Sequence, residues 1–314
     1  MRIWPVCVIA VVLLSAIGSG CRRGAREPGA AASETIRIEG SDTMVNLAQA
    51  WAERYHAKHS YVSIQVQGGG SGVGIASLTD GNCDIAASSR PIRDNEAQRI
   101  EAARGEGPVE HIVGFDALAI YVHPSNPIDT ISIEELAEIY GEGGNLTNWS
   151  QLGGPDISIT RVSRQNNSGT YAYFREAVLG TGREYKLGSI EQSGSKDVVA
   201  LVANTPGAIG YSGMGYATDA VKLLRVSRKK GEDGYAPSVE NVLAGHYPIT
   251  RPLYLYTIGE ESGVLAEFLD WILSAEGQTV VRELGYVPFD KRVKSPELAG
   301  GGSPATREIA TSAR

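Results

Sequence analysis

Three short stretches rich in glycine, serine and threonine carry groups that bind small anions. They occupy residues 39–44, 67–75 and 163–170, and each stands where a strand pattern gives way to a helix pattern. Glycine lets the backbone turn sharply and approach a ligand closely, and the free N–H groups of a helix's first turn attract anions. The third stretch adds Arg164, whose guanidinium can donate two parallel hydrogen bonds to two oxygens. Each stretch alone is weak evidence, but three of one design predict convergence on a single small anion.

The stretch at 67–75 does not match the phosphate loops of nucleotide-binding proteins. No Gly-Lys-Ser/Thr follows it, and its glycines lack the G-x-G-x-x-G spacing. We expect Ser71 to be the N-cap of a helix at 71–79, because a serine side chain accepts hydrogen bonds from first-turn N–H groups.

The many serines raise the alternative of a secreted hydrolase, either a phosphatase or a serine hydrolase. A serine nucleophile needs a base, yet the sequence has no G-x-S-x-G elbow and no histidine in the three stretches. His56 and His59 are expected to be solvated at a helix end, and no cluster with metal-ligand spacing accompanies them. Core or surface roles account for His111 and His123. We therefore expect no enzyme activity, no catalytic residues, no cofactor and no metal site.

The composition is that of a globular protein, and the length is sufficient for two domains. The chain has 314 residues, of which 42% are hydrophobic and 21% charged, so sizeable cores are possible. A formal net charge of −7 argues against nucleic acid as a partner, because that would need a basic face. The same charge does not exclude an anionic ligand, since a small buried site depends on local dipoles.

The first 21 residues have the features of an export signal. A basic start and an apolar run over 3–17 are followed by small residues before Cys21. Small residues before a cysteine resemble a bacterial lipoprotein cleavage site, which would leave Cys21 as the lipid-modified N-terminus. Gly18 stands where that motif has Leu, Val or Ile, so simple secretory cleavage stays open. Residues 22–34 are predicted to be a flexible tether and 293–314 a disordered tail.

Strand and helix patterns alternate along the body, which predicts an α/β fold with a largely parallel sheet. Strands are expected at 36–38, 61–66, 83–87 and 157–162, and helices at 43–58, 71–79, 94–104 and 195–203. Two long extended runs, 109–122 and 247–256, could cross between two lobes and leave a ligand cleft between them. Cys83 is the only cysteine of the body and is expected to be an inert buried thiol.

Several motifs in this order resemble the phosphate-binding proteins of bacterial phosphate ABC transporters, the PstS family. They are Gly-Ser-x-Thr at 40–43, Gly-Gly-Ser-Gly-x-Gly around Ser71, Asp-Ile-Ala-x-x-Ser-Arg at 84–90, Arg-x-x-x-Ser-Gly-Thr at 164–170, Pro-Gly-Ala-Ile-Gly-Tyr at 206–211 and Tyr-Pro-Ile-Thr-Arg-Pro-Leu at 247–253. The resemblance extends from about 36 to 289, which is nearly the whole folded body.

The resemblance implies a two-lobed periplasmic-binding-protein fold of type II, the Venus flytrap, with two crossover segments. Lobe I would comprise 35–115 and 252–292, and lobe II 116–251. Such a protein captures inorganic phosphate between its lobes and delivers it to a membrane ABC permease. We expect a monomer in the periplasm or at the outer face of the cytoplasmic membrane, anchored there through Cys21.

Matching the family's motifs position by position implies a set of phosphate ligands. They are Thr43 with the Met44 N–H group, Ser71, Arg164, Ser168, Gly169 and Thr170.

One departure from the family concerns selectivity. Well-known members have an aspartate at the position of Ser89, where it accepts the proton of hydrogen phosphate and so rejects sulfate. We hypothesise that Asp42 or a serine hydroxyl accepts that proton here, and we count Ser41, Asp42, Ser89 and Arg90 among the candidate phosphate-binding residues. Asp42 could equally be an ordinary acid at a helix start. Arg90 either adds charge to the site or holds carboxylates of the protein itself. A receptor or sensor for another oxyanion, such as sulfate, molybdate or a phosphonate, therefore remains the alternative.

Overall fold

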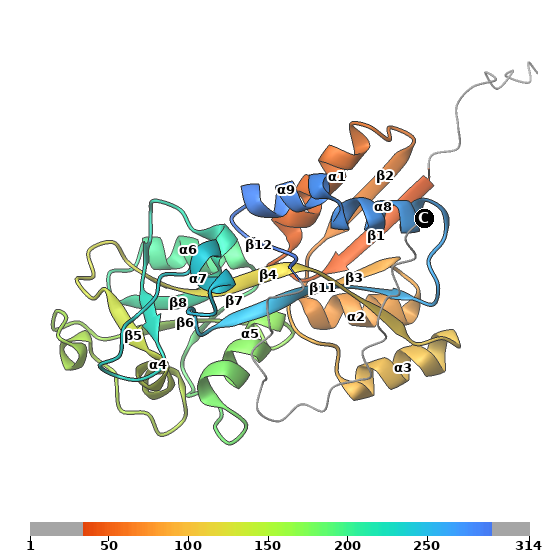
Figure 1. Cartoon of the computed structure of the whole chain (residues 1–314). Helices are drawn as coiled ribbons and strands as arrows, with labels where there is room; N and C mark the ends of the chain where they lie inside the picture. Colours follow the sequence, from red (N-terminus) through yellow and green to blue (C-terminus); the bar gives the residue numbers. More distant parts are fainter. Residues whose placement is uncertain (1–33, 291–314) are drawn as a thin grey trace, which may run out of the picture. The chain divides into compact units, whose positions relative to one another are not determined.

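The computed structural model describes residues 34–290 (Figure 1). The predicted signal at 1–21, the lipidation site Cys21, most of the tether and the tail at 293–314 lie outside the described residues. Strand β1 begins at Glu34, the residue at which the tether was predicted to end.

A ten-stranded sheet forms the centre of the fold, in the order β2-β1-β3-β11-β4-β8-β6-β7, with β9 and β12 paired to β4. Its strands are β1 (Glu34–Gly40), β2 (Val62–Gln67), β3 (Ile85–Ser88), β4 (Pro108–Val122), β6 (Thr160–Arg164), β7 (Ile190–Gln192), β8 (Ala208–Gly213), β9 (Lys222–Leu223), β11 (Thr250–Ile258) and β12 (Val287–Pro288). We call β2, β1 and β3 with their helices the first half, and β8, β6 and β7 with theirs the second half.

The prediction of a largely parallel sheet was wrong. Strand β1 is parallel to β2 and β3, and β6 is parallel to β7 and β8. The central pairs are antiparallel, namely β11 with β3, β11 with β4, and β4 with β8. The reason is that the chain enters the second half along β4 and returns along β11 in the opposite direction.

The two predicted extended runs are long strands that lie side by side. Strand β4 has 15 residues; its first part pairs with β11, and its last part, from Leu118 to Val122, pairs with β8. It therefore belongs to both halves of the sheet, as Figure 1 shows.

Helices cover both faces of the first half. Helices α1 (Val45–His56), α8 (Gly263–Leu273) and α9 (Ala275–Glu283) pack on one face, and α2 (Ser71–Asp80) and α3 (Asp94–Arg104) on the other. Apolar and aromatic side chains of β11 point alternately to the two faces of the sheet, because successive side chains of a strand point to opposite faces. Both faces therefore need a covering layer. Leu253 and Leu255 join the α1 core, whereas Tyr254 and Tyr256 join the α2 core.

The second half is arranged in the same way. Helix α4 (Ile133–Tyr140), α5 (Gly169–Phe174) and the π-helical turn Arg175–Leu179 pack on one face, and α6 (Ser195–Ala203) packs on the other. On β4, Leu118 and Ile120 face the α4 core, while Ala119 and Tyr121 face α6. Strands β5 (Thr130–Ser132) and β10 (Arg225–Ser227) form a separate two-stranded sheet. The remaining elements are η1 (Trp149–Leu152), η3 (Met214–Tyr216) and α7 (Val239–Leu243).

Two local predictions were wrong. Gly70, not Ser71, is the N-cap of α2, and Ser71 is the first residue of the helix. The strand predicted at 157–162 begins at Thr160, because Ile157 and Ile159 instead bond to the loop at 147–149.

The histidines and the single body cysteine have ordinary structural partners. His56 Nδ1 lies 2.8 Å from the carbonyl oxygen of Val62, and His59 stacks on Tyr55. Cys83 is buried, and this burial raises the pKa of its thiol to about 11. Such a thiol stays protonated and unreactive at neutral pH.

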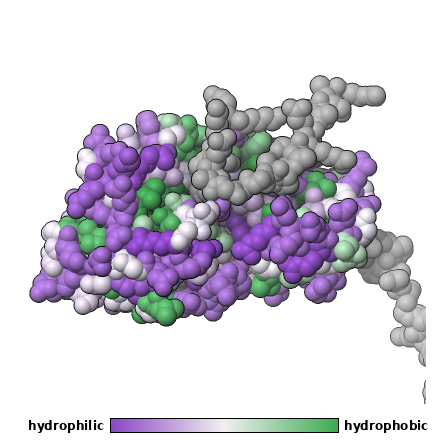
Figure 2. All heavy atoms as spheres, turned by 90° about the horizontal axis from the view of Figure 1, so that it is seen from below, coloured by the Kyte–Doolittle hydropathy of each residue, from purple (hydrophilic) through white to green (hydrophobic). Residues whose placement is uncertain are grey.

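The surface in Figure 2 is mostly hydrophilic, with isolated hydrophobic residues between. Within residues 34–290, no helix is long and apolar enough to cross a membrane.

Candidate functional site

The three glycine- and serine-rich stretches come together at one place. The hydroxyl oxygens of Thr43 and Thr170 lie 2.8 Å apart, although 127 residues separate them in the sequence. A Cβ atom added to Gly169 would lie 2.3 Å from Ser71 Oγ and 2.6 Å from Ser89 Oγ. The structure thus brings residues from both halves of the sheet into one buried cluster of hydroxyl groups.

The sheet positions these residues at the ends of its strands. Strands β1, β3 and β6 end at Gly40, Ser88 and Arg164, directly before the residues of the cluster. In open α/β sheets, ligands bind outside the carboxyl ends of the strands. Gly40 allows the close approach of β1 and β3, since its φ is +138° and a Cβ there would lie 2.2 Å from the Ala87 carbonyl oxygen.

Arg164 is fully buried and joins the two halves through Asp42. Its Nη2 donates to Asp42 Oδ2 at 2.8 Å and to the Ser193 carbonyl at 2.7 Å. Its Nη1 donates to Ser195 Oγ at 3.1 Å. Burial lowers the pKa of the guanidinium, and the nearby Asp42 carboxylate acts in the opposite direction. An arginine so placed stays charged, because its ordinary pKa lies far above neutral.

Asp42 accepts two hydrogen bonds, one from each half of the sheet. Besides Arg164, the backbone N–H of Gly69 donates to Asp42 Oδ1 at 2.9 Å. A carboxylate has about four lone-pair sites on its two oxygens. Two bonds therefore leave acceptor capacity on a carboxylate whose side chain keeps 18% of its surface exposed.

The serine hydroxyls of the cluster have defined partners. Ser71 Oγ accepts from the Ser89 N–H at 3.1 Å, and Ser168 Oγ accepts from the Thr170 N–H at 3.1 Å. An oxygen that already accepts an N–H bond keeps its own proton for donation to another acceptor. Ser41 Oγ donates to Ser89 Oγ at 3.0 Å, so these two hydroxyls bond to one another.

Met44 lies next to the cluster with its side chain in the core of the first half. Its N–H, a predicted phosphate ligand, donates in this structure to the Ser41 carbonyl at 2.9 Å.

Arg90 holds a carboxylate of the protein itself. Its Nη1 and Nη2 donate to the two carboxylate oxygens of Glu96 at 2.8 and 2.7 Å, and both side chains are buried. Of the two roles considered for Arg90, the structure shows this one. Glu96 also accepts from the Arg93 N–H, so the pair anchors the start of α3.

The sequence pattern did not reveal a buried ion pair beside the threonines. Arg251 on β11 and Asp116 on β4 are opposite each other in the strand register, and both are fully buried. Arg251 Nη2 donates to Asp116 Oδ2 at 2.8 Å, and also contacts the hydroxyl oxygens of Thr43 and Thr170. The sequence does contain a hint of this pair, since each of the two apolar runs includes a charged residue, and charged residues are rarely buried without a partner.

Each of the three arginines around the cluster has its own carboxylate. The pairs are Arg164–Asp42, Arg251–Asp116 and Arg90–Glu96. The cationic charge is therefore balanced within the protein. An anion would be held by oriented hydrogen-bond donors and local dipoles rather than by a net positive charge.

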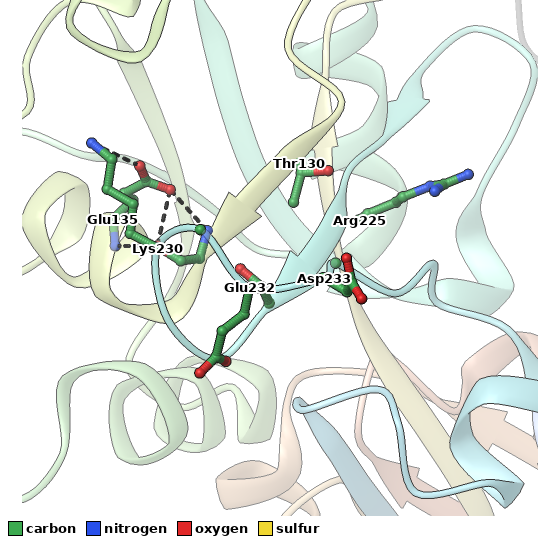
Figure 3. A pocket seen from close by; sticks show the side chains of 10 residues that line it. Thr130, Glu135, Arg225, Lys230, Glu232 and Asp233 are labelled. Carbon is green, nitrogen blue, oxygen red and sulfur yellow. Dashed lines mark hydrogen bonds and ion pairs between the residues drawn. The ribbon is translucent and has the colours of Figure 1, made fainter.

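A separate open pocket of about 410 Å³ lies beside the small sheet of β5 and β10 (Figure 3). Two of its lining residues form an ion pair, with Lys230 Nζ 3.6 Å from Glu135 Oε1. None of the predicted site residues lines this pocket. Acidic and basic side chains both line this pocket, and their arrangement does not indicate one class of ligand.

Comparison with known proteins gives a consistent result. A family model described as a PBP superfamily domain matches residues 25–276. The phosphate-binding protein PstS of Pseudomonas aeruginosa is 35% identical over 275 residues, covering 83% of this chain and 85% of that protein. The phosphate-binding protein PstS of Bacillus subtilis is 38% identical over 259 residues, covering 82% and 81%.

Solved structures extend the likeness to the fold. A provisionally designated phosphate ABC transporter substrate-binding protein from Clostridium perfringens, solved with bound phosphate, is 31% identical with a TM-score of 0.74. The match covers 82% of this chain and 100% of that one. An ABC-type phosphate transport receptor from Vibrio cholerae is 27% identical with a TM-score of 0.63, covering 80% and 99%. The α/β fold predicted from the sequence is confirmed as that of periplasmic binding proteins.

Proposed function

Because the chain belongs to the PstS family of phosphate-binding proteins, we propose that it captures inorganic phosphate outside the cytoplasm and delivers it to an ABC permease. The observation that carries the proposal is the buried cluster of four hydroxyl side chains from both halves of the sheet, with the buried Arg164 bonded to Asp42 beside it. Those hydroxyls belong to Thr43, Ser71, Ser168 and Thr170. Charge-assisted bonds from an arginine and hydroxyl donors suit the oxygens of a tetrahedral anion.

Gly169 lets hydroxyl groups from the two halves approach one another closely in this cluster. A side chain there would collide with the hydroxyls of Ser71 and Ser89. The proposed ligands are therefore able to approach the anion from several sides at once.

The two halves act as the two lobes of this proposal. The lobe boundaries expected from the family fall at 115/116 and 251/252, which places the paired residues Asp116 and Arg251 at the crossing strands. Contacts between the halves hold the site closed. Asn167 Nδ2 donates to the Gly69 carbonyl at 2.8 Å, and the Gly72 N–H donates to the Asn167 carbonyl at 3.1 Å.

Phosphate entry and release then require these contacts to open. Closure excludes water from the anion, which strengthens each charge-assisted bond. A permease that binds the open form better would shift the population toward release.

Binding without chemistry is the mode of action we propose. A hydrolase would need a base beside a serine of the cluster. Two histidines that could act as bases bond elsewhere. His111 Nε2 lies 3.0 Å from Thr257 Oγ1 and 2.9 Å from Glu261 Oε1, and His123 Nδ1 lies 2.7 Å from Ser125 Oγ. The lipid anchor at Cys21, the monomeric state and the extracytoplasmic location belong to this proposal as well.

Phosphate uptake in cells tests delivery. A bacterial strain that lacks its own phosphate-binding protein, but keeps a matching permease, should regain phosphate uptake with the wild-type chain and not with Arg164→Ala. Arg161→Ala is the matched control, because Arg161 lies on the same strand and bonds to Leu187 and Ser189 instead. Equal uptake with Arg164→Ala at equal protein level would contradict the proposal.

A further inference from the structure

Arg251 is fixed from several sides in the centre of the sheet. Its Nε and Nη2 donate to Asp116 Oδ2 at 3.1 and 2.8 Å, and its Nη1 donates to the Ser89 carbonyl at 3.2 Å. Its guanidinium carbon also lies 5.7 Å from the centre of the Tyr173 ring. Asp116 is held in turn by the Met214 N–H, which donates to Asp116 Oδ1 at 3.1 Å. The guanidinium therefore has one defined orientation.

One proton of Arg251 Nη2 points at the two threonines of the site. The Nη2 atom lies 3.2 Å from Thr43 Oγ1 and 3.0 Å from Thr170 Oγ1. A guanidinium nitrogen can only donate, so both hydroxyl oxygens act as acceptors toward it. The two threonines come from different halves of the sheet, so Arg251 bonds to both halves at the same point.

The acceptor role of these oxygens decides where their protons go. One hydroxyl proton lies between the two oxygens, which are 2.8 Å apart, and the other must point away from Arg251. An anion oxygen that contacts the pair can receive a proton from it. The hydroxyl whose proton points away from Arg251 accepts from both the guanidinium and its neighbour, so it has no free lone pair and can only donate to the ligand.

We propose that Arg251, held by Asp116, is a positioning residue of the oxyanion site that directs the remaining proton of the Thr43–Thr170 hydroxyl pair toward the ligand. This inference rests on the proposed function, because it concerns how that same site selects its anion. The donating hydroxyl would serve only an unprotonated oxygen of a tetrahedral oxyanion. The proton of hydrogen phosphate must then be accepted elsewhere, and Asp42 retains the capacity to do so.

A double-mutant cycle tests whether Arg251 acts through the threonine hydroxyl. The four proteins are the wild type, Thr170→Val, Arg251→Met with Asp116→Asn, and the three changes together. Asp116 is changed with Arg251 because a buried carboxylate without its partner is strongly destabilising. Phosphate affinity is measured by calorimetry for each, and thermal unfolding checks that each is folded.

The expected result is strong non-additivity. Thr170→Val and the paired replacement should each weaken phosphate binding about 10-fold or more, as for the loss of a buried charge-assisted contact. Together they should bind no worse than about 3-fold below Thr170→Val alone, because contacting residues couple. Thr79→Val, whose hydroxyl bonds to the Ile75 carbonyl on α2, is the control and should combine additively with the paired replacement.

The inference would be overturned if the fold losses in phosphate affinity of Thr170→Val and of the paired replacement multiplied in the combined variant. A wild-type protein that binds no phosphate would instead overturn the proposed function, so the two failures can be told apart. If the paired replacement does not fold, Arg251→Lys is used in the same cycle. It keeps a cation beside Asp116 but lacks the rigid guanidinium fork that fixes one donor toward the threonines, so the same non-additivity is expected and its absence again overturns the inference.

Discussion

Asp42 and Arg164 are 122 residues apart in the sequence, yet the Asp42 Oδ2 and Arg164 Nη2 atoms are 2.8 Å apart in the structure. Asp42 follows β1 in the first half, and Arg164 ends β6 in the second half. The ion pair therefore links the two halves at the edge of the proposed phosphate site. Because the two side chains are bonded to each other, replacing either one also alters the environment of its partner at the proposed site.

Replacing Arg164 with alanine should weaken phosphate binding by roughly 2–5 kcal/mol, the usual cost of removing one partner of a buried charge pair. Because Arg164 is fully buried, we expect that water does not take over the hydrogen bonds to the anion that the alanine variant loses. Isothermal titration calorimetry measures the change, with Arg161→Ala as the matched variant. A loss below about 1 kcal/mol, the range of an exposed ion pair, would remove Arg164 from the set of ligands.

Asp42→Asn should reduce the discrimination between phosphate and sulfate. The amide oxygen can still accept from the Gly69 N–H, but the carboxylate that accepts the proton of hydrogen phosphate is lost. Phosphate affinity should fall while sulfate affinity stays the same or rises, since sulfate brings no proton. Competition titrations give both constants, and Asp80→Asn at the exposed end of α2 serves as control. An unchanged ratio of the two affinities would assign Asp42 to the helix start alone.

Gly169→Ala should abolish tight phosphate binding while leaving the protein folded. The added methyl group would lie 2.3 Å from Ser71 Oγ, which forces the two halves apart at the site. Gly182→Ala is the control, because a Cβ at Gly182 meets nothing within 4 Å. Affinity within about 3-fold of the wild type, or about 0.7 kcal/mol, would show that the two halves tolerate a side chain between them, since that is within ordinary packing adjustment.

The Arg90–Glu96 pair should make stability depend on pH. Burial acts to raise the pKa of Glu96, but the hydrogen bonds from Arg90 and the Arg93 N–H prevail, and its pKa lies below the ordinary value of 4.5. A lowered folded-state pKa contributes stability that is present above pH 4.5 and is lost as the pH falls through the folded-state value.

Glu96→Gln removes that contribution. Urea unfolding should show the variant well below the wild type at pH 7, with the difference narrowing as the pH falls below about 4.5. A difference that is the same at pH 7 and at pH 3.5 would contradict this role of the pair.

The sequence predicted the parts of the site that depend on local pattern. Thr43, Ser71 and Thr170 lie at strand-to-helix junctions, where glycine and hydroxyl residues together are typical of anion binding, and the structure brings those junctions together. The helix at 195–203 begins and ends where its pattern indicated, because its apolar spacing is regular.

What the sequence did not predict depends on pairing between distant elements. Arg251 and Asp116 are charged residues inside apolar strands, and only the register of β11 against β4 shows that they neutralise one another. No sequence pattern around Arg90 indicated that it would pair with Glu96 rather than bind a ligand. The antiparallel centre of the sheet also follows from the path of the chain through both halves, which local patterns do not contain.

Calorimetric titration of ligand-free mature protein with inorganic phosphate, repeated in excess sulfate, tests the central claim most directly. We expect one phosphate site per chain, with tight binding that Arg164→Ala removes and Arg161→Ala keeps. Sulfate in excess should leave most of that binding intact if Asp42 accepts the phosphate proton. No heat of binding with phosphate would contradict the assignment of this cluster as a phosphate site.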